Sequence, residues 1–101
     1  MKKNLVLTGM MGVGKSTIGR SLSKKLNMSF IDLDRIIEKN ESATIKEIFK
    51  QKGEKYFRNL ERKIALKKLK KENSIIALGG GAFIDSQIRK EVLKNSISFW
   101  L

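Results

Sequence analysis

Residues 9–17 carry a pattern that binds phosphate groups. Their sequence, GMMGVGKST, matches G-x-x-x-x-G-K-[ST] and lies between an apolar run and a helix-like stretch. Glycines let the backbone wind around phosphates, while its N–H groups and the N-terminus of the following helix attract negative charge. We expect Lys15 to reach the β- and γ-phosphates of a nucleoside triphosphate, and the Ser16 hydroxyl to take one position on Mg²⁺. An ordinary glycine-rich turn is the alternative interpretation.

Three other groups of residues could act on a substrate beside this loop. Asp32 and Asp34 lie two positions apart at the end of an expected strand, so strand periodicity directs both carboxylates to one side. One could hold Mg²⁺ or its waters while the other orients or deprotonates a hydroxyl, although Asp-x-Asp is also typical of turns and helix caps. Arg58 could hold a carboxylate through two hydrogen bonds or be one more surface cation. The glycines at 79–81 could bring backbone N–H groups close to a substrate or form a flexible turn.

The residue types that are missing exclude whole classes of chemistry. The 101 residues include no His, no Cys and no Pro. Without His or Cys there is no Ser-His-Asp or Cys-His nucleophile, no imidazole or thiolate zinc site and no disulfide. Catalysis must therefore use carboxylates, Lys, Arg, hydroxyls, backbone amides or a metal held by oxygen atoms, such as Mg²⁺.

The chain is strongly basic, with 22 Lys and Arg against 10 Asp and Glu and a formal charge of +12. Dense lysine can neutralise nucleic-acid phosphates. On a helix through the basic segment 46–71, however, apolar residues recur on one face and leave most lysines on the opposite, solvated face. These apolar residues are Phe57, Leu60, Ile64 and Leu69. Because no aromatic-interleaved basic stripe accompanies the lysines, we do not expect nucleic-acid binding.

The pattern of apolar residues predicts strands that alternate with helices. The expected strands are 4–8, 29–32, 74–78 and 97–101, and the expected helices are 16–26, one that starts at 34–38, one from 44 to 53, 54–70 and 85–95. This alternation predicts an α/β fold, a parallel sheet with right-handed crossovers and helices on both faces. Such sheets bind ligands beyond the carboxyl ends of their strands, where the glycine and acidic motifs fall.

Local signals predict where the helices begin and, for the first helix, which apolar residues share a face. Thr44 and Glu47 have the pattern of a capping box, and Gly53 should break the helix that follows. Asp85 should cap the last helix. In the first helix, four-residue spacing predicts one apolar face, made by Ile18, Leu22 and Leu26.

Length and composition predict a single globular domain. The chain is 41% hydrophobic and 32% charged, which is ordinary for such a domain. Glycines and Lys15 interrupt the apolar run near the N-terminus, and no cleavage site with small residues follows it. We therefore expect no export signal, no membrane span and a cytoplasmic location.

Taken together, these residues make the sequence similar to the shikimate kinase family from Leu5 to Leu101. The motifs that carry the resemblance are residues 9–19, Asp32-Leu33-Asp34, Gly53-Glu54 with Phe57-Arg58 and Glu61, and Gly79-Gly80-Gly81. The resemblance implies the P-loop fold of the nucleoside-monophosphate kinases. It also implies Mg²⁺-dependent transfer of the ATP γ-phosphate to the 3-hydroxyl of shikimate, a step towards chorismate and the aromatic amino acids.

The resemblance implies a role for each matching residue. The ATP phosphates would be held by consecutive loop residues, namely Gly12, Val13, Gly14, Lys15, Ser16 and Thr17. Lys15 would stabilise the transferring group, and Mg²⁺ would bind Ser16 directly and Asp32 through water. Shikimate would contact Asp34, which could act as the base, together with Arg58 and the backbone of Gly79, Gly80 and Gly81. The rest of the pocket wall would be formed by Phe49, Phe57 and Glu61.

Members of the family continue beyond the matched region, through a lid with an arginine, a second shikimate-binding arginine, a fifth strand and an adenine-binding loop. With the family's strand order of 2-3-1-4-5, we expect residues 1–101 to supply four of five strands and one P-loop kinase domain that is incomplete at its C-terminus. We expect little or no turnover from these residues alone, since an arginine that neutralises a phosphoryl transition state contributes on the order of 10³ or more in rate. The complete protein is expected to be a monomer.

Two alternatives stay open. One is another P-loop small-molecule kinase, such as a gluconate-kinase-like enzyme. The other is a non-catalytic module that binds nucleotides or nucleic acid through its basic helices. The aspartate pair, Arg58 and the triple glycine favour the shikimate kinase family over both.

Overall fold

The computed structural model describes residues 4–8, 13–79 and 81–100, and for residues 13–16, 83, 95 and 97–100 it describes the backbone alone. The elements follow in the order β1 (Asn4–Thr8), α1 (Val13–Leu26), β2 (Ser29–Asp32), α2 (Leu33–Glu41), α3 (Ile45–Leu69), β3 (Ser74–Ala77), a 3-10 helix (Ala82–Ile84), α4 (Ser86–Asn95) and β4 (Ser96–Trp100). The alternation predicted from the apolar pattern is confirmed. Among the described residues, the short 3-10 helix is the element that the sequence pattern did not predict.

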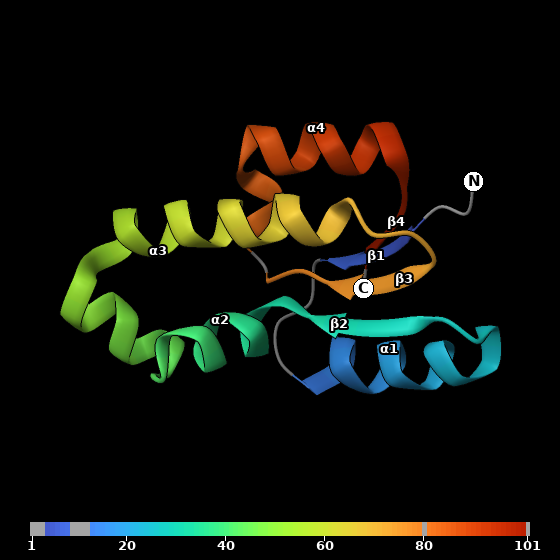
Figure 1. Cartoon of the computed structure of the whole chain (residues 1–101), viewed down its shortest axis with the longest axis horizontal. Coiled ribbons are helices and arrows are strands. Elements are labelled where there is room, and N and C mark those ends of the chain that lie inside the picture. Colours follow the sequence, from blue (N-terminus) through green and yellow to red (C-terminus); the bar gives the residue numbers. More distant parts are fainter. Residues whose placement is uncertain (1–3, 9–12, 80, 101) are drawn as a thin grey trace.

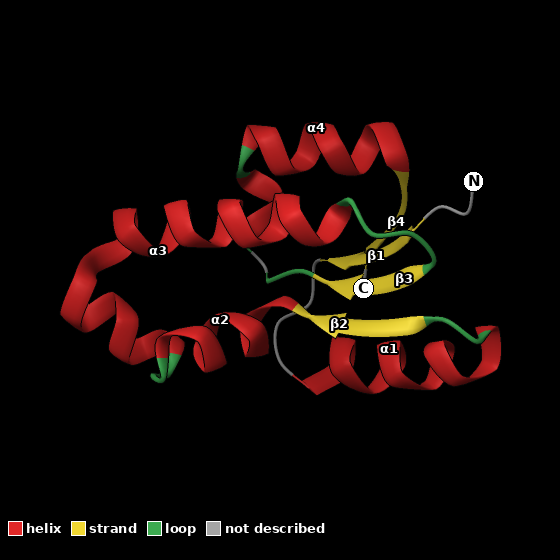
Figure 2. Ribbon diagram, viewed as in Figure 1, coloured by secondary structure: helices red, strands yellow, loops and turns green. Residues whose placement is uncertain are grey.

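The described strands form one parallel sheet in the order β2-β3-β1-β4 (Figure 2). Leu5 of β1 pairs with Ile75 of β3 on one side and with Ile97 of β4 on the other. Helix α1 lies on one face of the sheet, and α3 and α4 lie on the other (Figure 1). The predicted α/β class, with helices on both faces and the first four strands in the expected order, is confirmed.

The apolar core lies where the sheet meets α2, α3 and α4. Every residue of β3 is buried, as expected for a parallel strand covered on both faces. Helix α2 buries Leu33 and Ile37, and α4 buries Ile88 and Val92, each pair four residues apart on one helix face. These contacts hold α2 and α4 against the sheet and so fix the loops at its carboxyl edge.

The predicted helix α1 is confirmed, but the apolar residues that share one of its faces are largely exposed in the described structure. Ile18 is 40% exposed and Leu26 is 50% exposed, while Leu22 is half-buried. The helix instead turns Gly19 towards the sheet, where a methyl group would come within 2.8 Å of Cδ1 of Phe30. A glycine at this contact lets the helix backbone approach Phe30 closely.

Helix α3 has the start and the break that the sequence predicted. The Thr44 hydroxyl accepts a hydrogen bond from the Glu47 N–H at 3.1 Å, and the Glu47 carboxylate accepts one from the Thr44 N–H at 2.9 Å, which completes the capping box. At Gly53 the backbone leaves the helix, with φ 86° and ψ 166°. The chain bends there and continues to Leu69 along the side of the sheet (Figure 1).

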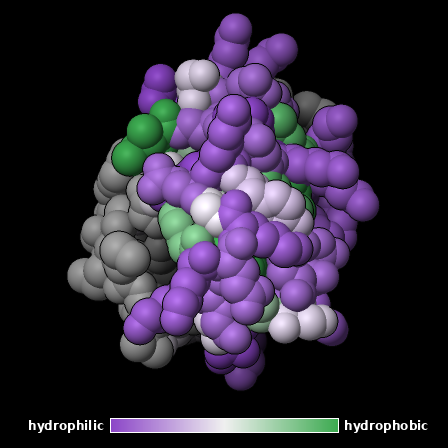
Figure 3. Space-filling model, turned by 90° about the vertical axis from the view of Figure 1, so that its left-hand side faces the viewer, coloured by the Kyte–Doolittle hydropathy of each residue, from purple (hydrophilic) through white to green (hydrophobic). Residues whose placement is uncertain are grey.

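Most lysines of α3 are solvated, as predicted. Phe57 and Leu69 are buried, and Leu60 and Ile64 are half-buried on the same helix. The exposed lysines of this helix are Lys46, Lys50, Lys52, Lys55, Lys63 and Lys67. The end of the molecule formed by α2 and the first part of α3 is mainly hydrophilic (Figure 3). The expectation that this charge does not serve nucleic acid stays a prediction.

Asn4 ties the start of the sheet to the connection after α3. Its buried side chain donates to the carbonyl oxygens of Leu69, at 3.2 Å, and Lys71, at 2.5 Å, and its Oδ1 accepts from the Ser74 N–H at 2.9 Å. These bonds hold the end of α3 beside β1 and β3. Within the described residues, no helix is long and apolar enough to cross a membrane.

Candidate active site

The candidate site lies at the carboxyl ends of the parallel strands. Asp32 ends β2 and pairs in register with Ala77, which ends β3. It also caps α2, because its Oδ1 accepts from the Arg35 N–H at 3.5 Å. Asp34 already belongs to the first turn of α2. The argument from strand periodicity for the two aspartates is therefore wrong, since the strand ends at Asp32 and a helix directs the side chain of Asp34.

Asp34 lies against the glycine turn that follows β3. A methyl group at Gly79 would come within 2.9 Å of Oδ1 of Asp34 and 3.3 Å of its Oδ2. Gly79 is buried, so a side chain there would have to push the carboxylate away. The structure thus brings together two of the residues that the sequence singled out, one from the start of α2 and one from the end of β3.

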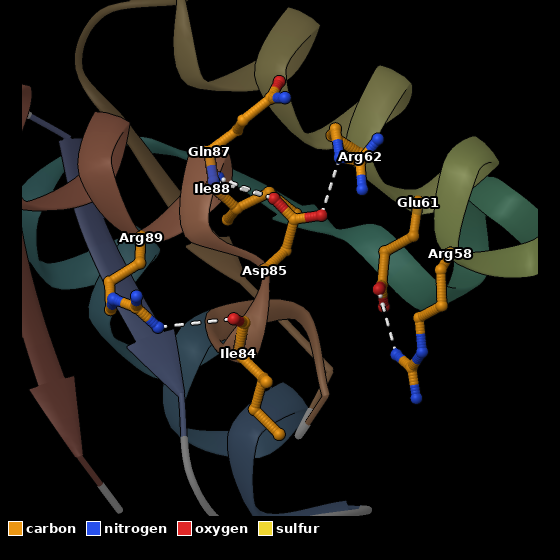
Figure 4. Close-up of polar contacts among 8 residues, drawn as sticks. All are labelled: Arg58, Glu61, Arg62, Ile84, Asp85, Gln87, Ile88 and Arg89. Atoms are coloured by element: carbon orange, nitrogen blue, oxygen red, sulfur yellow. Dashed lines mark hydrogen bonds and ion pairs between the residues drawn. The ribbon is translucent and has the colours of Figure 1, made fainter. Parts of the chain in front are cut away.

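Arg58 approaches the same turn from α3. A methyl group at Gly81 would lie 2.6 Å from Nη2 and 2.7 Å from Cζ of Arg58. The Arg58 Nη1 donates to Oε1 of Glu61 at 3.0 Å, one helical turn further along (Figure 4). Arg58 is 38% exposed, whereas Glu61 is 2% exposed. The pair therefore leaves part of the guanidinium open to solvent or to a ligand.

Two aromatic rings lie beside Arg58. The ring centroids of Phe49 and Phe57 are 4.7 Å apart. The Cζ atom of Arg58 lies 5.3 Å from the ring of Phe57 and 5.9 Å from that of Phe49. A guanidinium near aromatic faces is favoured electrostatically and is restricted in its orientation. The rings of Phe49 and Phe57 thus lie beside Arg58, and their role in a pocket wall stays a prediction.

Glu61 is an acid whose environment opposes its charge. Burial raises the pKa of Glu61 above its ordinary value, and the hydrogen bond and positive charge of Arg58 lower it by less. The negative charges of Asp34 and Asp85 raise the pKa further. This carboxyl thus accepts a hydrogen bond from Arg58 although its burial and two negative charges favour its neutral form.

An open pocket of about 350 Å³ lies next to Arg58. Its lining combines charged groups with one glycine and one apolar side chain: Glu54, Arg58, Arg62, Gly81, Ile84 and Asp85. Sequence reasoning did not place Arg62 or Ile84 at the site and treated Asp85 as a helix cap. The four-residue spacing of Arg58 and Arg62, which puts both on one face of α3, was the available signal.

Residues 9–12 of the phosphate loop, Gly12 among them, fall outside the described residues, and so does Gly80 of the glycine turn. Val13, Gly14, Lys15 and Ser16 form the first turn of α1, described by backbone alone, and Thr17 is exposed. The helix therefore begins inside the motif, which directs its N-terminal N–H groups to the place where phosphates are expected.

One carboxylate at this edge has the chemistry of a magnesium ligand. Asp32 offers a carboxylate at the end of β2, and the buried Thr8 Oγ1 at the end of β1 has no hydrogen-bond partner within the described part of the chain. No cluster of three or more Asp, Glu, His or Cys among the described residues could hold a metal. Mg²⁺ usually keeps several waters and takes one or two protein oxygens besides phosphate oxygens, so a single carboxylate is sufficient.

A parallel sheet with a helix that starts within a phosphate-binding motif is typical of P-loop proteins. The family model for shikimate kinase matches residues 11–101. The chain therefore belongs to the shikimate kinase family, which decides against the gluconate-kinase-like alternative.

Relatives of known name agree with this assignment. Shikimate kinase of Zymomonas mobilis is 48% identical over 99 residues, and that of Bartonella henselae is 50% identical over 97 residues. The alignments cover 98% and 96% of this chain but 56% and 46% of the two relatives. The chain thus spans about half the length of these relatives.

Solved structures of the family have the same fold. Shikimate kinase from Acinetobacter baumannii in complex with shikimate superposes with a TM-score of 0.93 at 35% identity, over 99% of this chain and 56% of that one. The enzyme from Bacteroides thetaiotaomicron gives a TM-score of 0.91 at 37% identity, over 98% of this chain and 59% of that one.

Proposed function

We propose that this chain supplies the phosphate-binding and shikimate-binding part of a shikimate kinase, which transfers the γ-phosphate of ATP to the 3-hydroxyl of shikimate. The observation that carries the proposal is the close approach of Asp34 to Gly79 and of Arg58 to Gly81 at the carboxyl edge of the sheet. A carboxylate and a guanidinium held on two sides of one glycine turn suit a small ligand that has hydroxyls at one end and a carboxylate at the other.

In this proposal Arg58 binds the carboxylate of shikimate through its exposed guanidinium, which Glu61 and the rings of Phe49 and Phe57 keep in orientation. Asp34 accepts hydrogen bonds from the ring hydroxyls and takes the proton of the hydroxyl that attacks phosphorus. Backbone N–H groups of the glycine turn contact the ligand. The shikimate complex of the relative from Acinetobacter baumannii supports this choice of substrate.

The phosphate end of the reaction belongs to the other motif. Residues 12–17 bind the ATP phosphates, and Lys15 neutralises charge on the transferring group. Ser16 and Asp32 would hold Mg²⁺, Asp32 through water, and such an ion would supply charge neutralisation at the phosphates. Phosphoryl transfer through a loose transition state depends mainly on positioning and charge neutralisation, so a site of Lys, Asp and Arg needs no His.

Product analysis tests the proposal. The chain is incubated with ATP, Mg²⁺ and either shikimate or gluconate, and phosphorus NMR identifies any phosphate ester and the hydroxyl that carries it. Because these residues alone are expected to give little or no turnover, we expect that any ester formed in a long incubation is on the 3-hydroxyl of shikimate, that none forms on gluconate, and that Lys15→Ala forms none. A phosphate ester on gluconate, or a shikimate ester that Lys15→Ala forms equally fast, would contradict the proposal. A slow rate, a cytoplasmic location and a monomeric whole protein stay predictions from the sequence.

A further inference from the structure

A second ion pair joins α3 to the segment that follows the glycine turn. Arg62 lies one helical turn after Arg58 on the same face of α3 and donates from Nε to Oδ2 of Asp85 at 2.6 Å (Figure 4). The Asp85 side chain is 11% exposed and that of Arg62 is 36% exposed. A short, charge-assisted hydrogen bond whose acceptor is largely shielded from solvent is stronger than one between neutral groups.

Asp85 is itself firmly attached to its own segment. Its Oδ1 caps α4 by accepting from the N–H groups of Gln87, at 2.9 Å, and Ile88, at 3.1 Å. Its own N–H donates to the carbonyl oxygen of Ala82 at 3.1 Å. One carboxylate oxygen therefore serves the helix cap and the other serves α3, so the two functions can be separated by mutation.

Hydrogen bonds continue from Asp85 back to the glycines. The N–H of Ala82 donates to the carbonyl oxygen of Gly79 at 3.0 Å, and the N–H of Ile84 donates to that of Gly81 at 3.2 Å. The turn that ends at Asp85 is thus continuous with the residues that face Arg58 and Asp34. Any change in the spacing between α3 and Asp85 must reach Gly81 and the guanidinium beside it.

We propose that Arg62 and Asp85 are positioning residues, whose ion pair sets the spacing between α3 and the glycine turn and so holds Arg58 in place for the carboxylate of its substrate. The pair also satisfies the charge of Arg62, which lines the same pocket as Arg58. The inference rests on the proposed role of Arg58 in binding shikimate.

Two variants remove the pair from opposite sides. Arg62→Gln removes the charge and shortens the reach of the side chain. In Asp85→Ser the side chain is too short to reach Arg62, but its hydroxyl can still cap α4. Asp85→Ala loses both the ion pair and the cap. The difference between the Ala and Ser variants therefore measures the contribution of the cap. Thermal unfolding of each variant separates a local change from a loss of the fold.

A first measurement needs no ligand. Amide hydrogen exchange at Ala82 and Ile84 reports the turn directly, and the amide of Ile48, bonded to the carbonyl of Thr44, is a distant reference. We expect Arg62→Gln and Asp85→Ser each to speed exchange at Ala82 and Ile84 by about threefold to tenfold, the double variant no further, and Ile48 unchanged. Unchanged exchange at both turn amides would overturn the inference.

Binding then separates position from charge. If the pair positions Arg58, both variants weaken shikimate binding by about threefold to tenfold and leave ADP binding unchanged. If charge alone mattered, Asp85→Ser would free the cation of Arg62 and tighten binding of an anionic substrate, which would overturn the inference. If the unaltered chain bound no shikimate, the proposed function would be contradicted. The hydrogen exchange at Ala82 and Ile84 would still show whether the ion pair holds the glycine turn.

Discussion

At the residue scale, Gly81 and Arg58 depend on each other. Gly81 has φ −87°, a conformation that any residue adopts, so the reason for glycine here is space. Its Cβ would meet the guanidinium of Arg58. The glycine turn therefore limits where the cation can lie.

Gly81→Ala should displace the guanidinium of Arg58 with little strain in the backbone. We expect the affinity for shikimate to fall by about tenfold or more, because an ion-paired hydrogen bond is lost, while ADP binding and Tm change little. Calorimetric titration measures both ligands. In an Arg58→Met background, Gly81→Ala should have no further effect, and an equal loss in both backgrounds would contradict the steric argument.

Glu61 gives a prediction for pH. The folded state raises the pKa of Glu61, so its proton is held more tightly in the folded than in the unfolded chain. This contribution to stability is full below the ordinary pKa of 4.5 and is lost as the pH rises through the folded value.

Glu61→Gln removes this titration and can still accept a hydrogen bond from Arg58. We expect the Tm of Glu61→Gln, relative to the unaltered chain, to increase as the pH is raised from about 4 to about 7. Thermal scans across this range measure it, with the exposed Glu72→Gln as the matched control. A Tm difference that is independent of pH would refute the assignment.

Much of the residue-scale site could be predicted from the sequence. Asp34, Arg58, Gly79 and Gly81 stand in motifs with fixed spacing, and each lies where a strand end or a helix carries it. The pair of Arg62 and Asp85 could not be predicted, because it joins residues 23 positions apart through the orientation of two helices.

At the element scale, the bend in α3 depends on one glycine. Gly53 has φ 86° and ψ 166°, and a methyl group there would meet nothing within 4 Å. On either side of the bend, Lys52 and Tyr56 both contact Glu41 at the end of α2, at 3.1 and 2.9 Å. The backbone conformation of Gly53 thus makes the bend, and Lys52 and Tyr56 connect the bent segment to the end of α2 through Glu41.

Gly53→Ala should therefore destabilise the chain through backbone strain alone. This φ/ψ region is almost exclusive to glycine, so we expect a loss of about 1 to 3 kcal/mol in the free energy of unfolding. Urea denaturation measures it, and the exposed neighbour Gln51→Ala is the control. A Gly53→Ala variant as stable as the unaltered chain would show that the helix can straighten without loss.

Elements were more predictable than their orientation. The capping box of Thr44 and Glu47 and the cap at Asp85 are local patterns, and the structure confirms them. Ile18 and Leu26 have the spacing of one helix face, but that face is exposed in the described structure, since spacing alone does not say what a helix face packs against.

At the scale of the whole molecule, the order of the strands brings distant motifs to one edge. Asp32, Gly79 and the start of α1 come from three separate parts of the chain, and the parallel sheet places their strand ends side by side. The tie made by Asn4 to the end of α3 was not predictable, since an asparagine at a strand start has no pattern that reveals its partners. The charge of +12 lies mostly on solvated lysines.

The central claim is that this edge binds shikimate through Arg58. Titration calorimetry of shikimate and of its methyl ester, on the unaltered chain and on Arg58→Met, tests it, with the exposed Lys55→Met as the control for lost charge. We predict that the unaltered chain and Lys55→Met bind shikimate about tenfold or more tightly than the ester, and that Arg58→Met binds the two equally weakly. A preference for the free acid that survives in Arg58→Met would contradict the account.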